Sequence, residues 1–227
     1  MKNIVSVFTL SAITGIILII LGFSYPKSNV FNGFIIIGIC ILLGIAIKTM
    51  DQLIDESTSK NNKIFLIPLA IFIPFSIAYL ALSEEPVIGM VIGTVLGLLI
   101  AGKLDHPMYI VSVILFILLV FVAYIMHVMT AEINTLYIIP VAATGSFLDE
   151  FGHEKYKHGK ITVFMFEHRF FLKIFAFLGF ILGFAQLVHL IGFLCFDIFY
   201  DLIDSAWHLD IKNVKIGLKN AQGSLNE

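Results

Sequence analysis

The residues best suited to chemistry are acids that stand where apolar stretches of the sequence end. Four such stretches run out into polar clusters, whose acids include Asp51 and Asp55, Asp105, Asp149, and Asp201 with Asp204. If the stretches are helices that cross a membrane, all four clusters lie at the same membrane face. Carboxylates gathered at one mouth of a helical bundle are what a divalent metal ion and a phosphorylated substrate would need.

Asp51 and Asp55 are the first candidate metal-binding pair. Residues four positions apart share one face of a helix, so both carboxylates can hold one hard cation from the same side. Mg²⁺ takes one or two protein carboxylates and completes its shell with water and substrate phosphates. The alternative interpretation is a solvated helix end whose acids only face water.

Asp149 and His153 form a second pair with the same spacing, and basic residues follow them. The next lysines in the chain are Lys155, Lys157 and Lys160. Lysines beside a carboxylate cluster fit a metal-bound phosphate that sits between them, although an ordinary charged loop is the alternative. Arg169 is the only arginine in the chain and therefore the best candidate for a two-pronged phosphate contact.

Three other groups have both a structural and a functional interpretation. Asp105 stands before Pro107, where it would cap the start of a helix or contribute to the site. Asp197 and His189 fall at membrane depth, where an ionisable residue indicates function by default. His189 could equally hydrogen-bond to a neighbouring helix. The sequence has no basic stripe of the kind that binds nucleic acids.

The composition predicts an integral membrane protein. Of the 227 residues 59% are hydrophobic and 13% are charged, and the mean hydropathy is +1.00. Soluble domains average about 25% charged residues. The apolar runs are near the length of a bilayer span and do not alternate, so they are predicted to be helices.

The expected fold is an all-α polytopic membrane bundle of about eight transmembrane helices. The expected spans are 4–25, 30–50, 64–82, 87–104, 109–128, 132–149 and one or two within 169–205. Lysines concentrate on one side of these spans, which predicts a cytoplasmic N-terminus and an even number of helices. We expect one domain at 1–205, a cytoplasmic loop at about 150–168 and a short polar tail at 206–227, in a prokaryotic plasma membrane.

The two metal-site motifs resemble those of the UbiA-type intramembrane prenyltransferases. That family carries N-x-x-x-D-x-x-x-D after its second helix and D-x-x-x-D after its sixth. Asp51 and Asp55 match the acids of the first motif, and Asp149 matches the first acid of the second. Ile47 stands where the family has Asn, and His153 stands where it has the last Asp. The residues 158–163 are similar to the Gly-x-x-Thr stretch of the family.

The resemblance implies transfer of a prenyl group from a prenyl diphosphate to a lipid or aromatic acceptor at the cytoplasmic face. Mg²⁺ would be held by the catalytic residues, which are Asp51, Asp55, Asp149 and His153. The substrate would be bound by Lys48, Asp105, Lys157, Lys160 and Arg169. One alternative is a cation or proton transporter with Asp197 and His189 on its path. Another is a non-catalytic membrane partner that docks through residues 150–168.

Overall fold

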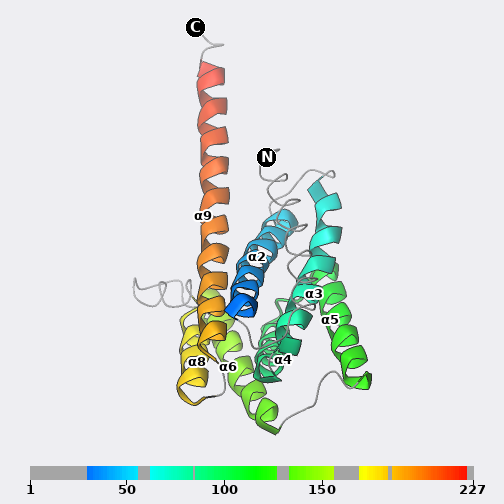
Figure 1. Cartoon of the computed structure of the whole chain (residues 1–227). Helices are drawn as coiled ribbons and strands as arrows, with labels where there is room; N and C mark the ends of the chain where they lie inside the picture. Colours follow the sequence, from blue (N-terminus) through cyan, green and yellow to red (C-terminus); the bar gives the residue numbers. More distant parts are fainter. Residues whose placement is uncertain are drawn as a thin grey trace.

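The described part of the protein consists of helices and short turns. The structure, a computed structural model, describes residues 30–55, 62–83, 85–126, 133–155, 169–183 and 186–223, and this part holds seven α-helices, one 3₁₀ helix and no strand. The elements are α2 (Val30–Asp55), η1 (Asn62–Phe65), α3 (Leu66–Ser83), α4 (Glu85–Ile100), α5 (Pro107–Ile125), α6 (Ile133–Lys155), α8 (Phe170–Ile181) and α9 (Leu187–Gly223) (Figure 1). The predicted all-α class is confirmed. The helix expected at 4–25 lies outside the described residues.

The stretch expected to hold one or two helices holds two, α8 and the start of α9. The chain turns between them at Gly183, which has a positive φ of 78° that favours glycine. His189 and Gly192 lie inside α9. α9 continues to Gly223 and projects beyond the other helices (Figure 1). The expected boundary at residue 205 therefore falls within a continuous helix.

Two of the described helices are long and apolar enough to cross a membrane, which is fewer than the sequence analysis expected. They are Gly33–Asp55 and Pro107–Ile125. Shorter apolar helices are Leu66–Leu82, Val87–Ile100 and Phe170–Ile181. By length and composition, these described helices do not establish a bundle of eight spans.

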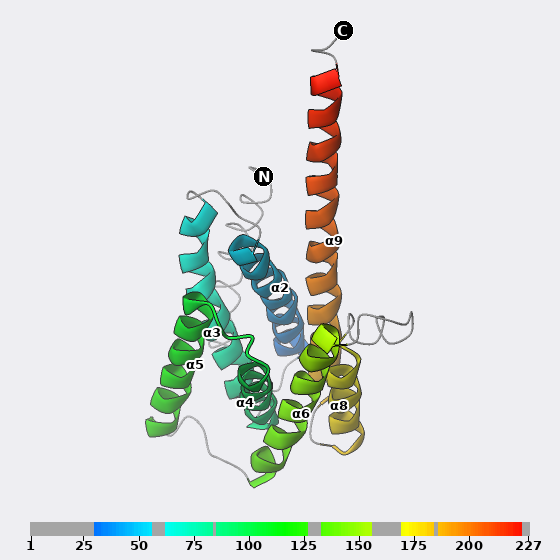
Figure 2. The same ribbon diagram turned by 180° about the vertical axis from the view of Figure 1, so that it is seen from behind.

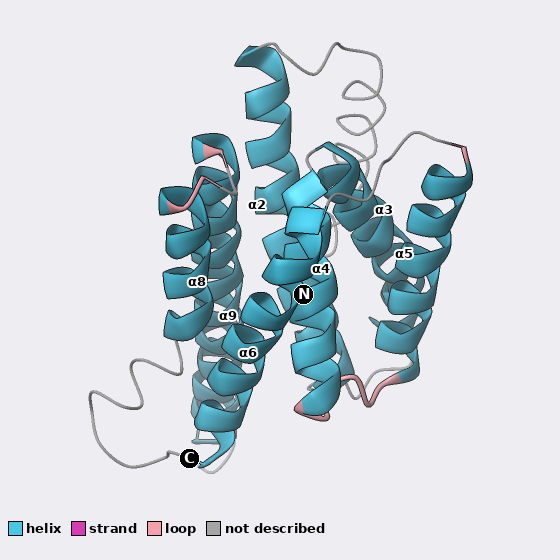
Figure 3. Ribbon diagram, turned by 90° about the horizontal axis from the view of Figure 1, so that it is seen from below, coloured by secondary structure: helices cyan, strands magenta, loops and turns pink. Residues whose placement is uncertain are grey.

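Six helices form a closed ring by their contacts. Going round it, α3 contacts α2, α2 contacts α9, α9 contacts α8, α8 contacts α6, α6 contacts α4, and α4 contacts α3 again. The seventh, α5, packs on α3 (Figure 2). Figure 3 shows the same helices from below, with α8 beside α9 and α5 beside α3. The largest buried cluster, which includes Ile39, Met50 and Phe72, joins α2 to α3.

Small residues let the α4 and α6 backbones approach closely. A Cβ atom built on Gly97 would lie 2.5 Å from the Ala143 carbonyl oxygen and 2.8 Å from the Ser146 Cβ atom. The Ser146 hydroxyl donates a hydrogen bond to the Thr94 carbonyl oxygen at 3.2 Å. Close packing of this kind is how apolar helices associate when their surroundings are apolar too.

Candidate functional site

A cavity of about 800 Å³ lies inside the bundle, between α2, α3, α4, α5, α6 and α9. It brings together every described residue that the sequence analysis assigned to metal or substrate. These residues are Lys48, Asp51, Asp55, Asp105, Asp149, His153 and Arg169. Lys157 and Lys160, which were assigned to the substrate as well, lie outside the described residues.

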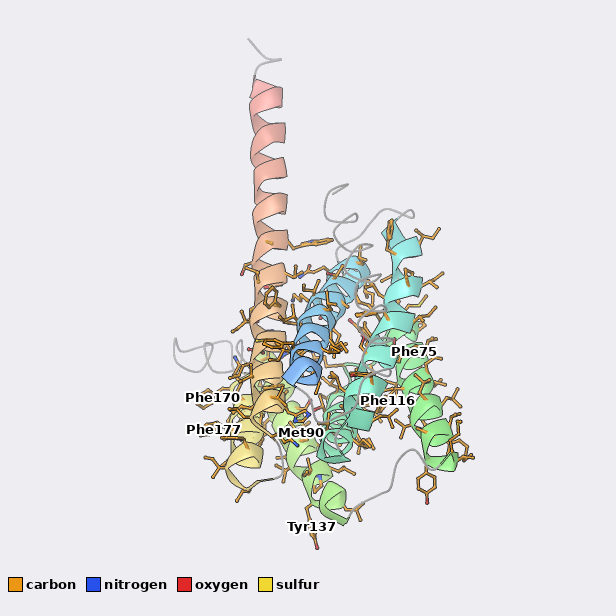
Figure 4. The ribbon with its side chains drawn as sticks, viewed as in Figure 1. Phe75, Met90, Phe116, Tyr137, Phe170 and Phe177 are labelled. Atoms are coloured by element: carbon orange, nitrogen blue, oxygen red, sulfur yellow. The ribbon has the colours of Figure 1, made fainter. Side chains whose placement is uncertain are left out.

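One end of the cavity is polar and the other is apolar. Along α5 the lining residues Tyr109, Ser112, Val113 and Phe116 form one stripe, which spans about 10 Å at 1.5 Å per residue. Phe116, which is labelled in Figure 4, is buried in a cluster with Ala78, Ala81 and Ile88. The apolar lining from α3 and α4 is completed by Ile73, Ile77, Val95 and Leu98. The cavity therefore suits a molecule with a charged head and a hydrocarbon tail.

The polar end carries more acids than bases. Seven carboxylates line it against three cations, Lys48, Lys103 and Arg169, which leaves a formal excess of four negative charges. The carboxylates are Asp51, Asp55, Asp105, Asp149, Glu150, Asp201 and Asp204. Such a mouth attracts cations and repels a bare anion.

Asp51 joins three helices through its two carboxylate oxygens. The Tyr200 hydroxyl of α9 donates to Oδ2 at 2.7 Å, and the Tyr109 hydroxyl of α5 donates to Oδ1. Sequence reasoning missed both tyrosines because it searched for acids, histidines and bases. The available signal was their position, since each lies within four residues of one of the acidic clusters that follow the apolar stretches.

Asp55 lies one helical turn after Asp51, at the end of α2. Its side chain is exposed, and no described residue forms a hydrogen bond or ion pair with it. His153 is also exposed, in the last turn of α6. Among the described residues, no three His, Cys, Asp or Glu side chains group closely enough to form a ready metal site. The four expected ligands therefore do not make one preformed cluster.

Asp149 is buried and holds the start of α8. Its two oxygens accept hydrogen bonds from the backbone N–H groups of Phe171 at 3.0 Å and Leu172 at 2.8 Å. The first backbone N–H groups of a helix have no partner inside the helix, so this carboxylate acts as a cap supplied from α6. Asp149 was expected to bind metal, and this structure gives it a structural role.

Arg169 stands directly before α8 in a left-handed backbone conformation, with φ 47° and ψ 49°. It is the one residue other than glycine with a positive φ in the described part of the chain. Its guanidinium carbon lies 4.1 Å from the centre of the Tyr200 ring. Burial opposes its charge, but Tyr200 and Glu150 outweigh that effect and hold the pKa of Arg169 above its usual value. Arg169 is therefore a fixed cation at the cavity mouth.

Lys48 is held beside the same tyrosine. Its Nζ atom lies 2.7 Å from an Asp204 carboxylate oxygen and 4.9 Å from the centre of the Tyr200 ring. Gln52 Nε2 donates to Asp204 at 2.8 Å. Two cations thus surround one aromatic ring, an arrangement that the negative face of the ring stabilises.

One interpretation predicted that Asp105 caps α5, but it does not. His106 does so, since its Nδ1 atom accepts a hydrogen bond from the Met108 N–H at 3.2 Å, and Pro107 takes the first helical position. Asp105 is exposed and lines the cavity. Its position leaves it available to the site.

Asp197 and His189 do not line the cavity. Asp197 is buried and forms an ion pair with Lys173 of α8. The Lys173 Nζ atom lies 2.5 Å from Asp197 Oδ2. The two ring nitrogens of His189 are buried without a hydrogen-bond partner in the described structure. The Asp197 pair links α8 to α9, which gives this acid a structural explanation.

Replacing Asp197 by alanine is expected to lower the free energy of unfolding by about 1–2 kcal/mol, because Lys173 loses its partner. Water reaches the Lys173 side chain, which is 28% exposed, and this keeps the loss moderate. The double variant Lys173→Met with Asp197→Leu should recover most of it. Unfolding in detergent measures both, and a single variant as stable as the wild type would contradict a stabilising pair.

Searches against protein-family models, curated proteins and solved structures find no match to this chain. The cavity and its residues are therefore the features of this protein that indicate a function.

Proposed function

We propose that the protein is an integral membrane enzyme that transfers a prenyl group from a prenyl diphosphate to a lipid or aromatic acceptor. The observation that carries the proposal is the cavity, whose charged mouth lies over an apolar interior. A prenyl diphosphate has the same two parts, a charged head and an apolar tail. The partial UbiA-type motifs contribute Asp51 and Asp55 to that mouth.

The proposed setting is a membrane crossed by about eight helices. The seven described α-helices and the helix expected at 4–25 would supply them, with the N-terminus in the cytoplasm. The acidic ends of α2 and α6 and the start of α5 all line the cavity mouth. With the N-terminus in the cytoplasm, the mouth would lie at the cytoplasmic face, and we propose a prokaryotic plasma membrane as the location.

Mg²⁺ suits the oxygen donors at this mouth. Asp55 has no described partner, and Asp51 lies one turn away on the same helix. Mg²⁺ needs only one or two protein carboxylates when substrate phosphates complete its shell, so the pair is sufficient. Bound there, the ion would neutralise diphosphate charge and stabilise the leaving group. Because acids outnumber bases at the mouth, a diphosphate is expected to enter together with a cation that offsets its charge.

The protein's own cations and apolar side chains have separate tasks in this proposal. Arg169 and Lys48 bind the phosphate oxygens and stabilise the charge that develops on the departing diphosphate. Ile73, Ile77 and Phe116 surround the tail and exclude water from the reacting carbon. An acceptor that enters from the same cavity then meets the allylic group in a dry site.

Wild-type protein in detergent is expected to unfold at a higher temperature when Mg²⁺ and geranylgeranyl diphosphate are both present. A ligand that binds only the folded state stabilises it by about 2.7 kcal/mol at one hundred times its Kd. Asp55→Asn should lose this stabilisation because the ion loses its unpartnered carboxylate. Thermal unfolding followed by fluorescence measures the midpoint.

Geranylgeraniol with Mg²⁺ is the matched ligand control, because it has the tail without the diphosphate. It should leave the midpoint nearly unchanged. The absence of any rise with metal and diphosphate together would contradict the proposed function.

The two alternatives from the sequence have no observation that favours them. Transport would use Asp197 and His189, neither of which lines the cavity. A docking role would use residues 150–168, most of which lie outside the described structure.

A further inference from the structure

Two hydroxyl donors meet at the Asp51 carboxylate, and two cations lie against the ring of one of them. The hydroxyls of Tyr109 and Tyr200 donate to this carboxylate, one to each oxygen. Arg169 and Lys48 lie against the ring of Tyr200, at 4.1 Å and 4.9 Å from its centre. Two hydroxyl donors and two cations are the components of a phosphate site, since phosphate oxygens accept hydrogen bonds and carry negative charge. In this structure the Asp51 carboxylate accepts the two hydroxyl hydrogen bonds that a phosphate group could accept.

The acids at this place do not use all of the positive charge around them, as Arg169 shows. It is half-buried and lines the cavity, yet no described carboxylate forms an ion pair with it. Its contact within the described structure is the face of Tyr200. A guanidinium has five N–H donors in a planar fork, so this side chain retains donors for a ligand in the cavity.

We infer that Asp51 occupies an anion site formed by Tyr109, Tyr200 and Arg169, which a diphosphate or phosphate group takes when Asp51 withdraws. The inference rests on the proposed function for the type of ligand, and it gives the two tyrosines a direct role in binding it. Asp51 then competes with the ligand for the same hydroxyls and repels it by charge. The tyrosines bind the head of the ligand, while the apolar lining from Ile73 to Phe116 lies below it.

Because of this competition, replacing Asp51 should change diphosphate affinity in opposite directions without and with Mg²⁺. Without divalent metal, removing the carboxylate frees two hydroxyl donors and one negative charge, so a diphosphate binds more tightly. With Mg²⁺, the same change removes a proposed metal ligand and weakens prenyl diphosphate binding. The metal-free measurement tests the anion site, and the Mg²⁺-dependent measurement tests the proposed function, so either can fail alone.

The experiment measures the Kd of inorganic diphosphate for the full chain in detergent, with EDTA present, by isothermal titration calorimetry. Asp51→Ala is expected to bind about tenfold more tightly than wild type, because the two hydroxyls no longer donate to a protein carboxylate and one repelling negative charge is gone. Asp51→Asn keeps one acceptor and should gain less. The triple variant Asp51→Ala, Tyr109→Phe and Tyr200→Phe should return to the wild-type affinity.

Tyr124→Phe is the matched control, because Tyr124 lies on α5 and does not line the cavity. It should leave the affinity unchanged. Geranyl diphosphate titrated in parallel separates the sources of the ligand: an equal gain assigns the site to a lipid head, and a gain for inorganic diphosphate alone assigns it to a free anion. If Asp51→Ala does not fold, Asp51→Asn alone decides. No gain in the folded Asp51 variant, or a gain that survives in the triple variant, would overturn the inference.

Discussion

Replacing Gly97 by leucine is expected to separate α4 from α6 and to lower the free energy of unfolding by about 3 kcal/mol or more, the upper range for overpacking. The first added atom would lie 2.5 Å from the Ala143 carbonyl oxygen, which is backbone and cannot rotate away. The helices would have to move apart. The Ser146 hydroxyl would then lose its bond to the Thr94 carbonyl oxygen as well.

Gly179→Leu on α8 is the control for this variant. Nothing lies within 4 Å of a Cβ atom at Gly179, so the same side chain is accommodated there. Thermal unfolding in detergent should show a large drop for the first variant and little change for the second. Because α4 and α6 both line the cavity, ligand binding should fall with the Gly97 variant. Equal midpoints for the two variants would contradict the close α4–α6 packing.

The gathering of the acids at one end of the bundle could be predicted from the sequence, because successive helices alternate in direction. Asp51, Asp105 and Asp149 are far apart in the chain, but each follows an apolar run that ends on the same side. Alternating helix direction then brings them to one end, and the cavity contains all three. The positions of the apolar runs are sufficient to predict this gathering.

Helix ends were predicted less well because hydropathy reports burial, not helix formation. The apolar run of α9 ends near residue 205, yet the helix continues to Gly223. No proline interrupts that polar extension. α6 likewise passes its last apolar residues and ends at Lys155, within the expected loop. Both cases show a helix continuing where its surroundings become polar.

The partners of the acids could not be predicted. Asp51 pairs with tyrosines 58 and 149 positions away. Such pairs depend on how far each helix is rotated about its own axis. An apolar helix with little polar patterning leaves this rotation undetermined, since all its faces are similar. Close contacts such as that of Gly97 with α6 set the rotation, and they are properties of two helices together.

Replacing Asp149 by alanine is expected to lower the free energy of unfolding by about 2–3 kcal/mol, because one buried and one partly buried N–H group lose a charged acceptor. Those groups belong to Phe171 and Leu172, at the start of α8. Arg169 precedes them directly and keeps a left-handed conformation that only surrounding contacts can maintain. Losing the cap should therefore also weaken the binding of inorganic diphosphate, although Asp149 is itself an acid.

Glu150→Gln is the matched control, since it removes the neighbouring acid of the same helix. Glu150 lies 3.9 Å from Lys103 in a partly exposed ion pair, which contributes little. Asp149→Asn keeps one acceptor oxygen and should fall between alanine and wild type. Thermal unfolding and hydrogen exchange at residues 170–173 measure the loss of the cap. If Asp149 instead serves mainly as a metal ligand, exchange at α8 would stay slow in the alanine variant while Mg²⁺ affinity falls, so the two roles give separate results.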